Sequence, residues 1–359
     1  MNPALADSVP RLKRIIPRLR GKRLGVLGDL MLDRYVWGTA TRLSPEAAVP
    51  IVDFVEESES LGGAGNVAAN LAVLGARVEV FAVIGPDKSG SEEPGRVLRR
   101  CLRDAHIDDQ GVLADSQRVT TVKTRIVAGH QHVVRVDRER SEPLRPQTEE
   151  RLLRILFSAL KHLDALVLSD YDKGLITDAL ADRVLNVCHQ LKVPVFVKPK
   201  TSRLYAYRGA RAIVCNAREA GFFVTRSLAD EQSVEEAGRT MLARFGSSAV
   251  LITRGKKGMI LIEETAPRAL RIPAISFEVT YARLGQTGID RQATGRQVFD
   301  VTGAGDTVLS TLVLASTAGA TLADAAILAN TAAGVVVGKL GTASVSPEEL
   351  TSALEDIRH

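Results

Sequence analysis

Aromatic side chains are scarce in this sequence, at 4% of its 359 residues. Proteins that bind single-stranded nucleic acid stack bases on such side chains, and most nucleic-acid binders gather their basic residues on one surface. Here the basic residues are scattered along the chain, so we expect no nucleic-acid partner. The net charge of +5 suits a small anionic ligand instead, such as a nucleotide or a sugar phosphate.

Cysteine is also rare, and Cys101, Cys188 and Cys215 form no CxxC pair. Because all three lie in or beside apolar stretches, we expect buried free thiols in a reducing compartment. The chain has no apolar run of membrane-spanning length, and its N-terminus lacks the apolar core of a signal peptide. Residues 11–23 are basic, with apolar residues at helical spacing, which favours an amphipathic surface helix over a membrane anchor. We therefore expect a cytoplasmic protein with no membrane partner.

Short apolar runs alternate with helical patterns over most of the chain. Buried strands are predicted near residues 24–28, 78–84, 165–168, 193–197, 212–215 and 249–253. Between them, apolar residues recur at helical spacing, as in Leu152, Leu153, Leu156 and Leu160. This alternation predicts an α/β fold with a mainly parallel central sheet flanked by helices. The sequence has no repeat and no clear linker, so we expect residues 1–359 to form a single domain.

Two stretches, at about residues 34–56 and 119–138, do not follow this alternation of strand and helix patterns. Both have strand character and many charges, without an intervening helix. We predict that they form a small antiparallel sheet, which projects from the main body and serves as a lid. A projecting sheet leaves exposed strand edges, and pairing two lids would cover them, so we expect a homodimer.

The segment Asp300–Thr307 reads DVTGAGDT and runs directly into an apolar helical pattern. Glycines let backbone N–H groups crowd around one point, and the following helix directs the positive end of its dipole there. Gly303, Ala304 and Gly305 would thus form an anion hole for the oxygens of a phosphoryl group in transfer. Asp306, at the mouth of the hole, would accept a proton from a sugar hydroxyl as it attacks. Taken alone, the pattern is explained as well by a glycine turn with an aspartate helix cap.

Two further motifs lie where predicted elements meet. Residues 62–68, GGAGNVA, predict a tight turn that opens a helix. They do not form a dinucleotide fingerprint, because no acidic residue ends a second strand at the expected place, and no GxxxxGK[ST] segment indicates a P-loop. Asn216 and Glu219 follow a predicted strand. An amide and a carboxylate at this spacing can hold Mg²⁺, directly or through water.

Together these motifs resemble those of the ribokinase-like (PfkB) carbohydrate kinases, over nearly the whole chain. DVTGAGDT is similar to the C-terminal signature of that family, in which the last aspartate is the catalytic base. The resemblance implies a ribokinase-like three-layer fold and an ATP-dependent sugar kinase that uses Mg²⁺, with Asp306 as its base. Residues similar to the family's sugar-contacting positions are Asp29, Asp33, Gly63 and Asn66. Residues similar to its ATP-contacting positions are Asn216, Ala217, Arg218, Glu219, Thr253, Gly255, Asn330 and Ala333, with Glu219 beside the metal.

Four longer segments, 28–35, 42–47, 168–174 and 333–342, are similar to those of the kinases of D-glycero-D-manno-heptose 7-phosphate. This resemblance implies transfer of the ATP γ-phosphate to O1 of the heptose. The product would be the 1,7-bisphosphate, a step toward the ADP-heptose of the lipopolysaccharide core. A kinase of another sugar or sugar phosphate, and a non-catalytic relative that binds nucleotide or sugar, are the alternatives.

The phosphate already present on such a substrate needs a cationic pocket. The lid stretches offer Arg42, Lys123, Arg125 and Arg135 for this role, because guanidinium groups match phosphate geometry. A solvated, charged strand face would explain each of them equally well. The kinases of this subgroup are often fused to a C-terminal nucleotidyltransferase domain, which we do not expect in residues 1–359.

The sequence departs from the family pattern at two places. Related kinases usually read Asp-Pro-Lys after the fourth main strand, whereas residues 198–200 are Lys-Pro-Lys. The exchange changes the local charge by two units, so it would alter magnesium handling or replace a water-mediated ion by a direct lysine contact. Residues 276–297 are longer than the family norm and are predicted to form an irregular loop. This loop would cover the nucleotide, mediate a subunit contact, or be a tolerated insertion.

Overall fold

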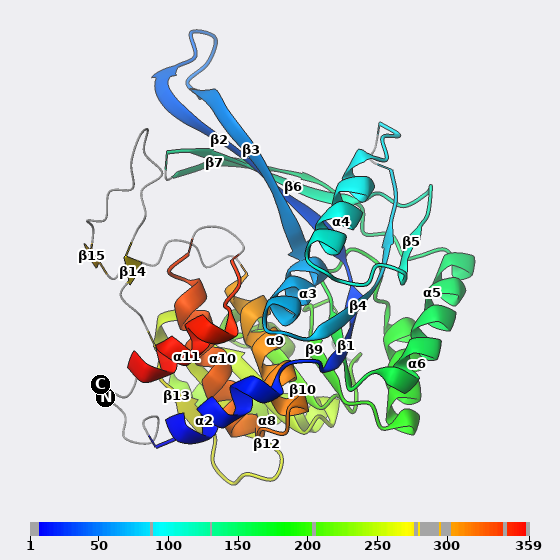
Figure 1. Cartoon of the computed structure of the whole chain (residues 1–359), viewed down its shortest axis with the longest axis vertical. Coiled ribbons are helices and arrows are strands. Elements are labelled where there is room, and N and C mark those ends of the chain that lie inside the picture. Colours follow the sequence, from blue (N-terminus) through cyan, green and yellow to red (C-terminus); the bar gives the residue numbers. More distant parts are fainter. Residues whose placement is uncertain are drawn as a thin grey trace.

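The computed structural model describes residues 7–86, 89–129, 131–202, 206–275, 303–339 and 343–356, together with short strands at 279–280 and 294–295. Within this part, the main body is a nine-stranded sheet of order β13-β12-β11-β10-β9-β8-β1-β4-β5, flanked by helices (Figure 1). Strands β11 to β5 in this order are parallel, and β12 and β13 join antiparallel at one edge. The strands are β1 (Arg23–Gly28), β4 (Arg77–Ile84), β5 (Val112–Ala114), β8 (Ala165–Ser169), β9 (Val195–Lys198), β10 (Ala212–Asn216), β11 (Ala249–Thr253), β12 (Met259–Glu263) and β13 (Leu270–Ile272).

The parallel strands are buried on both faces, and for this reason they appear in the sequence as continuous apolar runs. All five residues of β8 are buried, as are five of the six in β1. The predicted α/β fold with a mainly parallel sheet is therefore confirmed. The flanking helices are α2 (Val9–Ile15), η1 (Ile16–Arg18), α3 (Ala64–Val73), α4 (Glu93–Asp104), α5 (Pro146–Ala159), η2 (Leu160–His162), α6 (Asp178–Leu191), α7 (Ala217–Phe223), α8 (Glu231–Phe245), η3 (Gly255–Lys257), α9 (Ala304–Thr317), α10 (Leu322–Val336) and α11 (Pro347–Asp356).

The basic N-terminal segment forms α2 and η1, and its apolar residues face the protein. Leu12, Ile15, Ile16 and Leu19 are buried, and α2 contacts α10 and α11. Within the described part of the chain, no helix is both long and apolar enough to span a bilayer. Cys188 and Cys215 are buried free thiols, as predicted, and Cys101 is half-buried.

The lid is a separate four-stranded sheet of order β3-β2-β6-β7, whose long β2–β3 hairpin extends away from the main body (Figure 1). The predicted antiparallel pairing is wrong in one respect, because β2 and β6 are parallel. β2 follows β1, and β6 follows β5. Because β1 and β5 run in the same direction in the main sheet, the chain leaves that sheet at the same edge both times. Two strands extend beyond the predicted ranges, because β2 (Leu30–Leu43) begins before residue 34 and β3 (Pro50–Gly63) ends after residue 56. The other two, β6 (Thr121–Ala128) and β7 (Gln131–Arg138), lie within the predicted range 119–138.

The long segment before the glycine turn lies mostly outside the described residues. Only the pairing of β14 (Val279–Thr280) with β15 (Thr294–Gly295) is described there. The expectation for residues 276–297, and the positions of residues 300–302 and 340–342, therefore fall outside the described part of the chain.

Candidate active site

Polar residues gather where the parallel strands of the main sheet end. Asp29 follows β1, Asp170 follows β8, Lys198 ends β9, Asn216 ends β10 and Thr253 ends β11. Because parallel strands run in the same direction, their carboxyl ends together form one edge of the sheet, and these side chains lie along that edge. In open α/β sheets this edge is where ligands bind.

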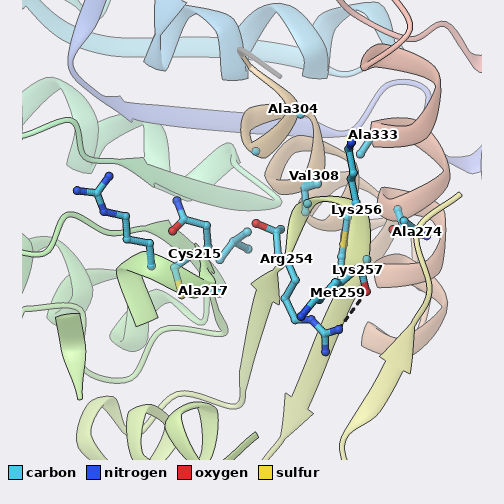
Figure 2. Close-up of a pocket in the computed structure, with 18 of the residues that line it drawn as sticks. Cys215, Ala217, Arg254, Lys256, Lys257, Met259, Ala274, Ala304, Val308 and Ala333 are labelled. Atoms are coloured by element: carbon cyan, nitrogen blue, oxygen red, sulfur yellow. Dashed lines mark hydrogen bonds between the residues drawn. The ribbon is translucent and has the colours of Figure 1, made fainter. Parts of the chain in front are cut away.

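A cavity of about 1230 Å³ opens beside this edge, between the ends of β9, β10 and β11 and the helices α9 and α10. In Figure 2, Ala304 and Val308 of α9 and Ala333 of α10 lie on one side of it, and Cys215 and Ala217 lie on another. The structure thus brings together residues that are widely separated in the sequence. Every residue that the sequence assigned to the nucleotide or to the anion hole lines this cavity: Asn216, Ala217, Arg218, Glu219, Thr253, Gly255, Asn330, Ala333, Gly303, Ala304 and Gly305.

The glycine turn at the start of α9 forms one wall of the cavity. Gly303 has a φ of 85°, in the left-handed region that side chains disfavour. The N–H groups of Asp306 and Thr307 donate to the Gly303 carbonyl at 2.8 and 3.0 Å. The N–H groups of Ala304 and Gly305, in the first turn, have no carbonyl acceptor within their own helix. They are therefore placed to bind an anion at the positive end of the helix dipole.

Hydrogen bonds between α3 and α9 fix the position of this turn. The Thr307 hydroxyl donates to the side-chain oxygen of Asn70 at 3.0 Å, and the Ser310 hydroxyl donates to the Val67 carbonyl at 3.0 Å. Both bonds are buried, so they hold the beginning of α9 in one position relative to α3.

Asp306 is buried, and three side chains donate to its carboxylate. Oδ1 accepts from Lys198 Nζ and from the Tyr171 hydroxyl, which lies at 2.7 Å. Oδ2 accepts from Asn66 Nδ2 at 2.8 Å. Each carboxylate oxygen has two lone-pair sites, so Oδ1 is filled, whereas Oδ2 can accept one more donor beside the only one it has among the described residues. Burial raises the pKa of Tyr171, so its hydroxyl stays protonated and remains a donor.

Asp29 anchors the loop that carries Tyr171. Its carboxylate accepts from the backbone N–H groups of Tyr171, Lys173 and Leu175 at 2.9, 3.2 and 3.4 Å. Burial, and then the charge of Asp170, raise the pKa of Asp29. Arg118 also lies 3.9 Å from this carboxylate. The described contacts of the Asp29 carboxylate, which the sequence assigned to the sugar, are therefore with the loop at 171–175 and with Arg118.

Asp33 lies at the base of the lid, where its carboxylate pairs with Arg125 at 2.6 Å. Both side chains are buried, and burial raises the pKa of Asp33 in spite of this partner. The end of β3 passes close to Asp33: a Cβ added to Gly62 would lie 2.5 Å from its Oδ2. Gly63 has a φ of 58°, and an added Cβ would lie 2.4 Å from the Asp29 carbonyl. The two glycines thus let β3 pass against both aspartates.

The predicted lid cations are paired with acids. Lys123 Nζ lies 2.9 Å from Asp137 and 3.0 Å from Glu139, and Arg135 binds Asp137 at 2.9 Å. Lys123 and Arg125 pair in the sheet with Asp33 and Tyr35, and Arg135 is opposite Arg125.

Arg42 is not brought to this group. It lies nine residues beyond Asp33 along β2, roughly 30 Å away at ~3.3 Å per residue. Its side chain is 66% exposed and lies 3.6 Å from Asp53. The structure therefore separates Arg42 from the other three predicted cations.

Asn216 and Glu219 form a capping box at the start of α7. The Glu219 N–H donates to Asn216 Oδ1 at 2.8 Å, and the Asn216 N–H donates to Glu219 Oε2 at 2.9 Å. Lys200 lies 3.9 Å from Glu219 Oε1. The Asn216 oxygen therefore serves as a helix cap, and no group of three metal-ligating side chains occurs in the described part of the chain. One carboxylate suits Mg²⁺ held mainly by phosphate oxygens and water.

Sequence reasoning missed two contacts at the centre of the site. Tyr171 lies within segment 168–174, which is similar to that of the heptose 7-phosphate kinases, but nothing in that segment predicted its hydrogen bond to Asp306. Lys198 was noted as a change of charge that would alter magnesium handling or supply a direct lysine contact. Its contact with Asp306, which joins residues 108 positions apart, was not predicted. The change of charge at the end of a strand was the one available signal.

Comparison with known proteins identifies the family. The family model described as pfkB family carbohydrate kinase matches residues 22–349. The bifunctional protein HldE of Geobacter metallireducens is 41% identical over 329 residues, covering 92% of this chain and 62% of that protein. The bifunctional protein HldE of Geotalea uraniireducens is 39% identical over 343 residues, covering 96% and 65%. The chain thus spans less than two thirds of the length of these relatives.

Solved structures show the same fold at low sequence identity. A ribokinase of Arabidopsis thaliana, complexed with ribose and ATP, matches with a TM-score of 0.68 and 17% identity, covering 93% of this chain and 99% of that one. Phosphofructokinase-2 of Escherichia coli, in complex with potassium, matches with a TM-score of 0.70 and 14% identity, covering 94% and 100%. The expected ribokinase-like fold is confirmed.

Proposed function

The chain belongs to the pfkB family of carbohydrate kinases, and from this premise we propose that it transfers the γ-phosphate of ATP to O1 of D-glycero-D-manno-heptose 7-phosphate. The product is the 1,7-bisphosphate, a step toward ADP-heptose for the lipopolysaccharide core. One observation carries the proposal: the Asp306 carboxylate lies at the start of α9, next to the glycine turn and to the cavity. A base and an anion hole thus stand side by side.

The cavity is suited to a nucleoside triphosphate by its size and charge. Its volume of about 1230 Å³ exceeds the range of about 300–1,000 Å³ that is usual for ligand sites. Its lining includes several cations, which would offset the charge of the phosphates: Lys198, Lys200, Arg218, Arg254, Lys256 and Lys257. Glu219 would hold a Mg²⁺ ion, which neutralises phosphate charge when bound.

The reaction follows from the position of Asp306. The sugar hydroxyl donates to the open site of Asp306 Oδ2, and its oxygen attacks the γ-phosphorus. As the new P–O bond forms, the proton passes to Oδ2 and the bond from the γ-phosphorus to the bridging oxygen breaks, which releases ADP. The N–H groups of Ala304 and Gly305 stabilise charge on the transferring oxygens. Asn66 and Tyr171 keep the carboxylate oriented, because each donates to a different oxygen.

The substrate assignment is supported by the four segments similar to heptose 7-phosphate kinases and by the HldE relatives at about 40% identity. Lys123 and Arg125, at the base of the lid, are the proposed contacts for the phosphate on C7. A kinase of another sugar phosphate is the alternative. The presence of Asp306 and of the whole glycine turn argues against a relative that only binds its ligands.

We further propose a single-domain, cytoplasmic protein that forms a homodimer through its lid. The lid exposes a group of large apolar side chains on strands at both of its edges and on the hairpin: Leu43, Val49, Phe54, Val55, Val133, Val134 and Val136. Exposed apolar side chains on open sheet edges favour pairing with another chain. Light scattering that gives a monomer mass at micromolar concentration would contradict this proposal.

A substrate panel tests the proposed reaction. Purified protein is incubated with ATP, Mg²⁺ and, separately, heptose 7-phosphate, unphosphorylated heptose, ribose 5-phosphate and fructose 6-phosphate, while ADP release is followed. We expect the highest kcat/KM with heptose 7-phosphate, and a second phosphate at C1 in the ³¹P NMR spectrum of the product. ADP release only with the other sugars would move the assignment to the alternative kinase.

A further inference from the structure

Lys198 occupies a position between the proposed base and the anion hole. It ends β9, and its Nζ contacts Oδ1 of Asp306 and lies 2.8 Å from the Tyr171 hydroxyl. The same nitrogen lies 3.8 Å from the point where a Cβ on Gly305 would be. The ammonium therefore lies next to the glycine turn that lines the cavity.

The surroundings of Lys198 are those of a buried cation with spare bonding capacity. Its side chain is only 17% exposed, and burying an ammonium is costly unless it is paired. Burial lowers the pKa of this ammonium, but Asp306 more than offsets that effect, so the pKa is raised and the group stays charged. An ammonium has three N–H donors, and contacts with described residues use two of them, so one is left beside the cavity.

Keeping Asp306 oriented does not by itself require a cation here. Tyr171 already donates to Oδ1 and Asn66 to Oδ2, so each oxygen has a neutral donor without Lys198. The reaction, however, brings a carboxylate and a γ-phosphate, both negative, to the same sugar hydroxyl. A cation that contacts both groups would offset their repulsion at this point.

We propose that Lys198 is a ligand of the transferring phosphoryl group, whose ammonium bridges Asp306 Oδ1 and an oxygen of the ATP γ-phosphate. Lys198 keeps its proton throughout, since the proton of the sugar passes to Asp306 Oδ2. The proposal rests on the proposed use of ATP but not on the identity of the sugar. It also gives a physical role to the lysine that replaces the aspartate usual in related kinases.

Nucleotide binding without sugar tests the proposal, because ADP lacks the γ-phosphate. Calorimetry would compare the non-hydrolysable analogue AMP-PNP with ADP, both with Mg²⁺, for wild type and Lys198→Met. We expect Lys198→Met to bind AMP-PNP about 10- to 100-fold more weakly, the loss typical of one charge-assisted hydrogen bond. Binding of ADP should change by less than about threefold. Equal losses for both nucleotides, or no loss for either, would overturn the proposal.

Lys200→Met is the matched control. It removes the same charge from the lining of the same cavity. Lys200 Nζ lies 3.9 Å from Glu219 and 5.4 Å from the centre of the Tyr171 ring, and its described contacts do not include Asp306. Its ratio of AMP-PNP to ADP affinity should stay within about threefold of wild type. A change as large as that of Lys198→Met would mean that the charge of the wall, and not Lys198, recognises the γ-phosphate, which refutes the assignment.

A further variant separates folding from function. If Lys198→Met does not melt cooperatively, Lys198→Gln takes its place, because glutamine keeps a donor at a similar length. The ratio of AMP-PNP to ADP affinity of this variant is then compared with that of wild type. Because no sugar is present, this result is independent of the substrate panel. A chain that phosphorylates none of the sugars but loses AMP-PNP selectivity in Lys198→Met would refute the proposed substrate and support the role of Lys198.

Discussion

Asp306→Asn is the substitution that most directly tests the base. It keeps the shape of the side chain and removes its ability to accept a proton. The amide oxygen of the new side chain must remain at the Oδ1 position, because Lys198 and Tyr171 both donate there. The new NH₂ group then faces Asn66 Nδ2, which is also a donor. Asn66 cannot turn over freely, since its own oxygen accepts from Asn70 at 3.1 Å.

Asp306→Asn should lower both the rate and the stability. General-base catalysis contributes about 10²- to 10⁴-fold, so kcat should fall by that factor, or by about 2.7–5.4 kcal/mol in activation free energy. Breaking a buried ion pair costs about 3–5 kcal/mol of stability. The lower end applies here, because Lys198 is partly exposed and keeps Tyr171 as a partner. The dissociation constant of ADP should change little.

The assay is ADP release at saturating ATP and sugar phosphate, with a thermal melt of each sample. Asp324→Asn serves as the control, since Asp324 lies on α10 and pairs with Arg11 at 3.1 Å, away from the cavity. It makes the same chemical change to a carboxylate in an ion pair, and its kcat should equal that of wild type. A folded Asp306→Asn protein that keeps kcat within about tenfold of wild type would refute the reasoning.

Three further substitutions test separate contacts. In Gly305→Ala, the added methyl meets the Lys198 side chain at 3.8 Å and no other side chain among the described residues. The melting temperature should therefore stay unchanged while kcat falls at least about tenfold, because the anion hole narrows. Arg125→Met leaves Asp33 buried without its partner, so urea unfolding should show a loss of about 3–5 kcal/mol. Burial raises the pKa of Asp115, but hydrogen bonds from Thr148, the Gln117 amide and Arg145 more than offset this and lower it. The stability that Asp115 contributes is therefore present above its unfolded pKa of about 3.9 and is lost as the pH falls through the lower folded value. The stability of Asp115→Asn relative to wild type should thus improve below about pH 4.

The main sheet was predictable because its signal is local. Each parallel strand is a short apolar run, and a helical pattern follows most of them, so the order of elements follows from the sequence. The lid was predictable only in part. Its strands are visible as charged stretches with alternating apolar residues, as in β7. The parallel pairing of β2 with β6 depends on which main-sheet strands are neighbours, and local sequence patterns do not contain that information.

The same distinction between local patterns and contacts of remote residues applies to the site. The resemblance to the family assigned the cavity residues, and most of them lie in motifs that follow a strand or open a helix, where the carboxyl ends of parallel strands meet at one edge. Asn330 and Ala333 lie inside α10, so the resemblance alone assigned them. The pairing of charges was not predicted, since it joins side chains that are remote in the sequence. Sequence reasoning offered Lys123 and Arg135 either as cations for a phosphate or as part of a solvated strand face. It missed Asp137 and Glu139, which neutralise them in the folded chain.

These pairs have a consequence for how an anionic substrate binds under the proposed function. Glu139 accepts from Lys123 and from Lys173 at 3.0 and 2.8 Å, so its carboxylate already occupies a site between two ammonium groups. Each lysine keeps at least one N–H donor that the acids among the described residues do not use. The phosphate of a sugar can therefore approach both lysines while Glu139 stays in place. Glu139 would then repel the phosphate, so under the proposed function this contact gains less than one with unpaired cations would.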